Sequence, residues 1–276
     1  MNEYISFDCH KQYTLAERED ARSGHQQHIR IDHRPGMIKR ALRDCEPATP
    51  VAVEATGNWY WIVDEIEAAG LIPKLVHPRK AKLMMGMINK TDRLDVHGLN
   101  LLQRNGTLPT VWIPPRDIRD LREITRTRMV MAQQRTRLKC RILATLNKYG
   151  LCPRGHSDPY GVKARKDLEE QLDNLPEHTR GTTVLLLQQL DFVQQQILDL
   201  ERRLKALLDV TPAMQRLMTI PGVGLILAAV IALEVGDVSR FRSPERLASY
   251  AGTVCTTHPC QRSDDATRSW NIFMPH

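Results

Sequence analysis

Four acidic residues lie at positions that an α/β fold would bring close together. Asp8 ends the first predicted strand and Glu54 a later one, whereas Asp92 and Asp95 lie three residues apart on one face of a predicted helix. Carboxylates at strand ends point into the crevice where open α/β sheets bind ligands. Such a cluster repels itself unless cations bind, and the oxygen ligands suit Mg²⁺. The four acids therefore indicate a two-metal site for phosphodiester chemistry, although each alone is also typical of a solvated surface.

Other chemistry is less well supported by the sequence. Two cysteines and a histidine, Cys255, His258 and Cys260, lie close together but lack a second CxxC pair and make a poor zinc site. The sequence contains no Walker A loop, no GxGxxG after a strand and no GxSxG elbow. Single histidines are more typical of core or surface positions than of metal ligands; these are His10, His77 and His97.

A basic stretch follows the acidic residues. Residues 113–148 contain 10 Lys/Arg and 3 Asp/Glu, although the whole chain carries a net charge of only +7. A local basic stripe is the electrostatic footprint of a polyanion partner, and a solvated helix face is the alternative. The candidate phosphate-binding residues are Arg116, Arg119, Arg122, Arg126, Arg135, Arg137, Lys139 and Arg141.

Residues 1–112 alternate strand and helix patterns, which predicts an α/β layer fold. Strands are expected at residues 4–8, 12–19, 25–33, 51–54 and 71–77, and helices at 37–44, 59–69 and 91–104. Asn58 is expected to cap the second helix. Pro73 places the start of its strand at a sheet edge.

Residues 113–210 are predicted to form long helices. The first runs from Arg116 to Tyr149. The second has apolar residues spaced 4-3-4-3-4-3, an unbroken a/d seam: Leu186, Leu190, Val193, Ile197, Leu200, Leu204 and Leu207. This seam predicts either a helical hairpin within the chain or a coiled coil between chains.

Residues 211–276 form the third predicted part. Ile220 to Gly224 precede a short apolar helix and are typical of the turn in a helix-hairpin-helix element. Gly222 and Gly224 would let backbone N–H groups face a phosphate at the helix N-terminus. A tight turn between buried helices is the alternative.

Composition and length limit the classes of protein. The chain has 276 residues, of which 42% are hydrophobic and 26% are charged, and this composition is typical of a globular protein. The longest nearly apolar run, residues 223–235, is too short to span a bilayer, so no membrane association is expected. The N-terminus shows no signal-peptide pattern, and six scattered cysteines favour a reducing, cytoplasmic location.

The chain resembles the DEDD transposases of bacterial insertion sequences, a group that includes Piv-type DNA invertases and bridge-RNA-guided recombinases. The blocks that carry this resemblance occur in the family's order; they are Phe7 to Lys11, Val53 to Gly57, His77-Pro78, Lys90 to Asp95, Ile220 to Gly224 and Phe241 to Gly252. The resemblance implies a RuvC-like, ribonuclease-H-like first domain, then a coiled coil and a C-terminal transposase domain. It makes Asp8, Glu54, Asp92 and Asp95 the catalytic metal ligands.

The resemblance also implies DNA cleavage and rejoining during transposition, action as a homo-oligomer, and an element-encoded guide RNA. The family's catalytic Ser-Gly pair is not found after Gly252; Cys260 lies near its expected position and Ser263 is the nearest serine. We therefore expect a C-terminally incomplete copy that keeps its acidic site. A RuvC-like nuclease without transposition and a non-catalytic nucleic-acid-binding remnant are the alternatives.

Overall fold

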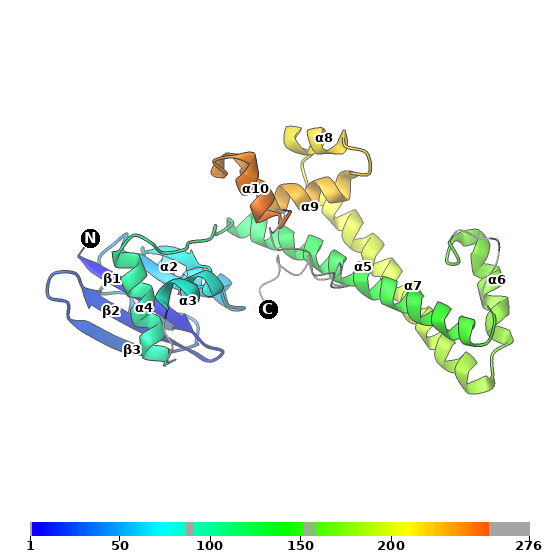
Figure 1. Ribbon diagram of the computed structural model, residues 1–276, viewed down its shortest axis with the longest axis horizontal. Coiled ribbons are helices and arrows are strands. Elements are labelled where there is room, and N and C mark those ends of the chain that lie inside the picture. The colour runs from blue at the N-terminus through cyan, green and yellow to red at the C-terminus, as the bar shows by residue number, and fades with distance from the viewer. Residues whose placement is uncertain (1, 87–90, 152–154, 156–157, 254–276) are drawn as a thin grey trace. The chain divides into compact units, whose positions relative to one another are not determined.

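The computed structural model describes residues 2–86, 91–151, 155 and 158–253. Within these, the chain forms two compact units. One contains the residues up to Ile113 together with those from Arg242 onward, and the other runs from Pro114 to Phe241. The first unit has a mixed sheet with helices, and the second is built on long helices (Figure 1).

The first unit is organised around a five-stranded sheet in the order β3-β2-β1-β4-β5. Neighbouring strands β1, β2 and β3 are antiparallel, whereas β4 is parallel to both β1 and β5. The strands are β1 (Glu3–Cys9), β2 (Tyr13–Asp20), β3 (Gln26–Asp32), β4 (Pro50–Glu54) and β5 (Ile72–Val76). Pro73 lies in an edge strand, because β5 ends the sheet.

Helices cover both faces of this sheet. The helices are α1 (Met37–Ala41), α2 (Trp59–Ala68), α3 (Pro78–Met85) and α4 (Asp92–Arg104). On one face Phe7 and Val53 pack with Ile38 of α1 and Ile62 of α2. On the other face Ala52 shares a core with residues of α3 and α4. Side chains alternate along a strand, so Ser6, Asp8, Ala52 and Glu54 all face α3 and α4.

Two local predictions differ from the structure. Asn58 stands at the N-cap of α2 but its side chain makes no capping bond; its amide instead donates to the carbonyl of His10 at 2.9 Å. We expected Pro78 only to end a strand, yet it also begins α3. Proline fits the first helical turn because that turn leaves its N–H groups without partners, and His77 Nδ1 accepts from the N–H of Lys80.

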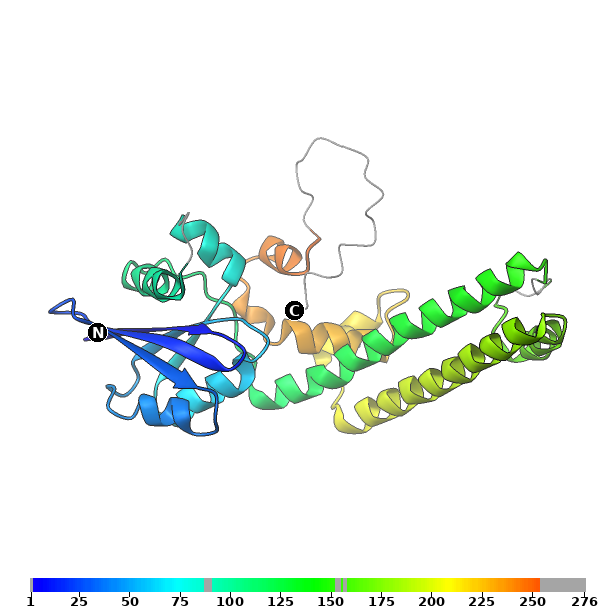
Figure 2. The same ribbon diagram turned by 90° about the horizontal axis from the view of Figure 1, so that it is seen from below.

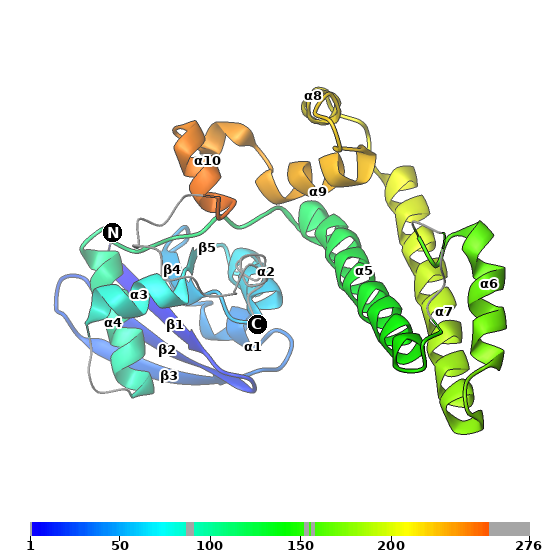
Figure 3. The same cartoon turned by 45° about the vertical axis from the view of Figure 1, so that its right-hand side comes forward.

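The second unit is centred on a helical hairpin. Helices α5 (Arg116–Lys148) and α7 (Glu177–Leu207) lie side by side, and α6 (Val162–Asp173) packs on α7 (Figures 2 and 3). Leu190, Val193, Ile197 and Leu204 of the predicted seam are buried. The two ends of the seam differ from the prediction. At one end Leu187 is buried instead of Leu186, and at the other end Leu207 is 55% exposed. The hairpin alternative therefore accounts for the apolar seam.

The segment after α7 joins the same unit. Helices α8 (Pro212–Met218) and α9 (Leu225–Val235) share a core with α5 and α7, and η1 (Val238–Arg240) follows. We predicted a separate part from residue 211; instead Ala228, Ala229 and Leu233 pack with Leu121 of α5 and Leu204 of α7. Helix α9 is apolar almost all round, so it needs neighbours on several sides. Helix α10 (Pro244–Tyr250) belongs to the first unit, and no described helix is long and apolar enough to cross a bilayer.

Buried arginines fix α9 to α5. Arg122 is 5% exposed and donates to the carbonyls of Leu233 at 2.9 Å and Glu234 at 3.0 Å. Arg126 donates to both carboxylate oxygens of Glu234, at 2.9 and 3.1 Å. Carbonyls in the last turn of a helix have no partner within the helix, so Arg122 satisfies acceptors that burial would otherwise leave unpaired.

We expect Arg122→Met to destabilise the second unit. Arg122 Nε also lies 3.6 Å from Glu234 Oε2 in a largely buried ion pair. Removing one partner of a buried ion pair typically costs about 3–5 kcal/mol, whereas the exposed Arg137→Met on the same helix should change stability by less than about 0.5 kcal/mol. Urea unfolding followed by far-ultraviolet circular dichroism measures both variants. Equal losses in the two would contradict this role of Arg122.

Candidate metal centre and nucleic-acid interface

The sheet brings the first two predicted acids together. Phe7 of β1 is the parallel partner of Val53 in β4, so Asp8 and Glu54 follow side by side where the two strands end. Both face the helical layer that contains α4. This placement agrees with the geometry expected of strand-end carboxylates.

Helix α4 brings the third acid to the same place. Thr91 caps α4 by accepting from the N–H of Leu94, and Asp92 is the first helical residue. The hydroxyl of Tyr13 donates to Asp92 Oδ2 at 3.2 Å. The packing of α4 on β1 and β2 therefore holds Asp92 close to the end of β1.

A histidine lies between Asp8 and Asp92. His10 Nε2 is 3.1 Å from Asp8 Oδ2 and 3.2 Å from Asp92 Oδ2. One ligand atom from each of the three residues lies within 4.8 Å of the other two. Nε2 is buried, yet it makes no aligned hydrogen bond to a described residue. Two carboxylate oxygens thus converge on one imidazole nitrogen, an arrangement that brings Asp8 and Asp92 close enough to share a cation.

The signal for His10 in the sequence is weak, because a single histidine is more often a core or surface residue. Its position two residues after Asp8, just past the strand end, was the available signal. The imidazole also stacks on Tyr13 with ring centroids 4.4 Å apart. Since Tyr13 bonds Asp92, the ring contact couples His10 to the start of α4.

Glu54 and Asp95 are near this group but are not part of it. Among the described residues, the group of ligand atoms within 4.8 Å contains Asp8, His10 and Asp92 without the other two acids. Asp95 lies on the first turn of α4, where its N–H donates to the carbonyl of Thr91. A single cluster of all four acids therefore stays a prediction.

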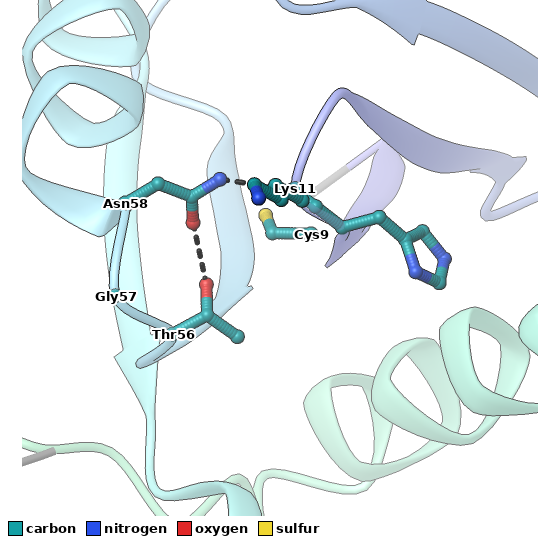
Figure 4. Close-up of a pocket in the computed structure, with 6 residues that line it drawn as sticks. Cys9, Lys11, Thr56, Gly57 and Asn58 are labelled. Atoms are coloured by element: carbon teal, nitrogen blue, oxygen red, sulfur yellow. Dashed lines mark hydrogen bonds between the residues drawn. The ribbon is translucent and has the colours of Figure 1, made fainter. Parts of the chain in front are cut away.

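A cavity of about 250 Å³ opens where β1 ends. Its lining comes from the end of β1 and from the turn before α2: Cys9, His10, Lys11, Thr56, Gly57 and Asn58. Figure 4 shows that Asn58 bridges the two segments: its amide donates to the carbonyl of His10, and its oxygen accepts from the Thr56 hydroxyl at 2.7 Å. These hydrogen bonds therefore fix one polar wall of the cavity.

Cys9 is not a candidate nucleophile in this cavity. Burial, with smaller contributions from the charges of Asp8 and Glu54, raises its pKa from 9.0 to about 12, against a lowering by the Thr14 hydrogen bond. A raised pKa keeps the thiol protonated at neutral pH, and the thiolate is the nucleophilic form. The carboxylates and His10 therefore remain the candidate reactive groups of the site.

The predicted basic stripe is only partly at the surface. Arg119 and Arg122 are buried, and Arg126 is held by Glu234. The prediction that these three arginines contact phosphates does not agree with this placement, because Arg119 and Arg122 are buried and Arg122 and Arg126 bind the end of α9. The remaining candidates differ in exposure. Arg135 bonds Gln194, Lys139 lies near Asp158 and Tyr160, and Arg116, Arg137 and Arg141 are exposed.

The glycine turn has the predicted backbone geometry. Gly222 has φ +87°, which side-chain-bearing residues rarely adopt, and Gly224 is the N-cap of α9. Whether phosphate binds there stays a prediction. Cys255, His258, Cys260 and Ser263, and with them the interpretation of the sequence past 253, lie outside the described residues.

Comparison with known proteins finds similarity to transposases. A DEDD transposase model of the IS110 type matches residues 32–151, and a model described as the transposase IS116/IS110/IS902 family matches residues 214–264. Two relatives are the transposase for insertion sequence element IS1328 of Yersinia enterocolitica and a probable family 20 transposase of Pseudomonas aeruginosa. They are 26% and 25% identical to this chain, over 79% and 80% of its length.

The match covers a smaller share of the relatives than of the chain. It spans 64% of the Yersinia protein and 67% of the Pseudomonas protein. A putative transposase of Sinorhizobium fredii is 31% identical over 73% of this chain but over 46% of its own length. The chain thus spans about half to two thirds of these relatives. The two family models lie in their expected order along the chain, and all three relatives are described as transposases, so the chain is similar to DEDD transposases of the IS110 type.

Proposed function

We propose that this chain is the transposase of a bacterial insertion sequence and that its first unit cleaves DNA with divalent cations. The observation that carries the proposal is the convergence of Asp8, His10 and Asp92 on one point. Similarity to transposases supports the reaction, and the strand-end geometry supports this location for it. Such a protein acts on the chromosome in the cytoplasm.

The residues fit a hard divalent cation. Asp8 and Asp92 each direct an oxygen at the same buried nitrogen, Glu54 lies beside Asp8, and Asp95 is on the first turn of α4. We assign all four acids as ligands of Mg²⁺, which polarises the scissile phosphodiester when bound. His10, which lies between Asp8 and Asp92, would orient the two aspartates. Lys11, on the rim of the neighbouring cavity, would attract the DNA phosphate.

The exposed part of α5 is the proposed nucleic-acid interface. Arg137 and Arg141 are four residues apart, so they share one helix face, and both are exposed. We propose that this face, with Arg116, Arg135 and Lys139, contacts DNA or an element-encoded guide RNA. Gly222 and Gly224 would add backbone N–H groups at the start of α9.

An oligomer interface is proposed on the outer face of α7. The inner seam packs in the hairpin, but Leu185 and Phe192, one heptad apart, are 64% and 63% exposed. Large apolar side chains repeated along one face of a long helix favour a second helix of the same kind. We therefore propose a homo-oligomer that joins through this outer face rather than through the inner seam.

Asp8→Asn should abolish DNA nicking by the purified chain in Mg²⁺. Loss of a group that stabilises transition-state charge typically lowers the rate roughly 100-fold or more. Asp44→Asn, an exposed aspartate in the same unit, is the matched control. Relaxation of supercoiled plasmid carrying the element ends measures both. Wild-type nicking by Asp8→Asn would contradict the proposed site; nicking without recombined junctions would favour the nuclease alternative.

Arg137→Gln with Arg141→Gln should flatten the salt dependence of nucleic-acid binding. Each arginine that neutralises a phosphate of duplex DNA adds about 0.9 to the slope of log K against log salt, so removing both should reduce that slope by nearly two. The exposed pair Arg202→Gln with Arg203→Gln on α7 removes the same charge. Fluorescence anisotropy over a salt series compares the two double variants. Equal slopes for them would place the nucleic acid elsewhere.

If the oligomer forms through the outer face of α7, substitutions on the outer and inner faces should have different effects. Leu185→Ser with Phe192→Ser should yield a smaller species by sedimentation equilibrium and keep its helical circular dichroism, because both side chains are exposed. Val193→Asp with Ile197→Asp should instead lose helical signal, because a charge buried in the hairpin has no partner. An unchanged oligomer in the first variant would exclude the outer face.

A further inference from the structure

Helix α3 presents basic and large apolar side chains to solvent together. Arg79, Lys80 and Lys82 are exposed, and the helix contains no acidic residue. None of these three side chains forms an ion pair with a residue that the structure describes. Leu83 is 76% exposed and Met84 is 49% exposed. Large apolar side chains that are exposed together mark an interaction site, so this face of α3 requires an explanation.

The helical repeat places the apolar side chains among the cations. Residues three and four apart are neighbours on a helix surface, so Leu83 lies beside Arg79 and Lys80, and Met84 lies beside Lys80. The positive charges favour an anionic partner, and the apolar side chains favour one that also offers apolar surface. Nucleic acid combines both properties, because its phosphates are anionic and every base has an apolar face.

The packing of α3 places this face close to the acidic residues. Val76, the last residue of β5, is paired with Glu54 of β4, and α3 begins two residues later. Ala81 is fully buried and shares a core with Ala52 of β4 and Leu99 of α4. Helices α3 and α4 therefore lie side by side over the same face of the sheet (Figures 1 and 3). A nucleic acid that binds at the acidic residues would also reach α3.

Chain geometry limits the distance between the acidic residues and Leu83. Neighbouring strands are about 4.8 Å apart, two extended residues span about 7 Å, and five helical residues span about 7.5 Å. The backbone of Leu83 is therefore at most roughly 19 Å from the end of β4, which is about six nucleotides at 3.4 Å each. A strand cleaved at the acidic residues would pass α3 within half a turn of duplex.

The charge of α3 also acts on the end of the sheet. Burial lowers the pKa of His77, and the charges of Lys80 and, to a smaller extent, Arg79 lower it further. His77 lies between Val76 and the first residue of α3. The positive potential thus extends to the strand end beside Glu54, where a phosphate must approach carboxylates that repel it.

We propose that α3 opens duplex DNA beside the cleavage site, with Leu83 inserted between bases and the cations of α3 bound to the flanking phosphates. Leucine and methionine are among the apolar side chains that proteins insert between base steps, and such insertion unstacks the bases and kinks the duplex. The inference rests on the proposed function, because it takes DNA as the substrate of the acidic site. It adds that α3 distorts this DNA so that one strand can approach the carboxylates.

Fluorescence of 2-aminopurine measures the unstacking, since this base brightens when it leaves the stack. A series of duplexes spanning one element end carries a single 2-aminopurine at successive positions. The Asp8→Asn chain, in which nicking is removed, is bound to each duplex. We expect a several-fold rise at one step that lies within about six nucleotides of the position where the wild-type chain nicks.

Substitutions on α3 test whether Leu83 causes this rise. Adding Leu83→Ser with Met84→Ser should abolish it, because serine is too small to separate two bases, and both positions are exposed, so the fold should be kept. Leu83→Met should retain the rise, because methionine is also apolar and long. The matched control is Ile72→Ser, which is 44% exposed at the end of β5 away from Glu54 and should leave the rise unchanged.

The salt dependence of binding tests the cations. Arg79→Gln with Lys80→Gln should reduce the slope of log K against log salt by nearly two, because each phosphate contact contributes about 0.9. Lys39→Gln with Arg40→Gln removes the same charge from α1, which covers the opposite face of the sheet, and should leave the slope unchanged.

The outcomes separate this inference from the proposed function. Binding without a rise at any position, or a rise that persists in Leu83→Ser with Met84→Ser, would overturn the inference while leaving the proposed function in place. A smaller species of that variant in sedimentation without DNA would assign the two side chains to a contact between copies and would also overturn it. Absence of duplex binding would overturn both. Because unstacking is measured in the Asp8→Asn chain, it does not depend on cleavage.

Discussion

The packing of one polar helix on the polar face of the sheet is the constraint on which the first unit depends. Helix α4 covers Ser6, whose hydroxyl donates to the carbonyl of Val96 at 2.7 Å in the buried interior. That bond fixes the distance between α4 and β1. Leu99 and Leu102 of α4 add apolar packing in the core that they share with Ala52 of β4. Because α4 begins at Asp92, the same packing sets the distance from Asp92 to Asp8. A shift of this helix would change the candidate site before it changed the core.

The strands and helices of the first unit could be predicted because their periodicity is local. Alternation located the edges of β1 to β5 to within a few residues, and the acids at their ends followed from it. His10 could not be found in this way, because its role depends on Asp92, 82 positions further along the chain. Helix α3 was missed for a different reason: Pro78 was interpreted as the end of a strand, although proline also begins helices.

In the second unit, the count of basic residues predicted more exposed arginines than the structure has. The basic stretch looked like one stripe, since sequence alone cannot separate an arginine facing water from one facing carbonyls. Arg122 and Arg126 face Glu234 and the end of α9 because α9 supplies acceptors that would otherwise be buried without donors. The a/d seam was a better guide, because its spacing reports burial directly. It could not show whether the partner helix was α5 or another chain.

The two polar clusters along α4 differ in how their carboxylates are balanced. At the start of the helix, Asp8 and Asp92 converge on one histidine where β1 ends. Further along, the fully buried Glu17 of β2 accepts from Asn100 of α4 at 2.9 Å, and Glu19 accepts from Arg104 at 2.8 Å. A helix that begins with an acid close to Asp8 gains from being held at a second point, since repulsion between the acids would otherwise push it away from the sheet. The bonds from Asn100 and Arg104 provide that second point.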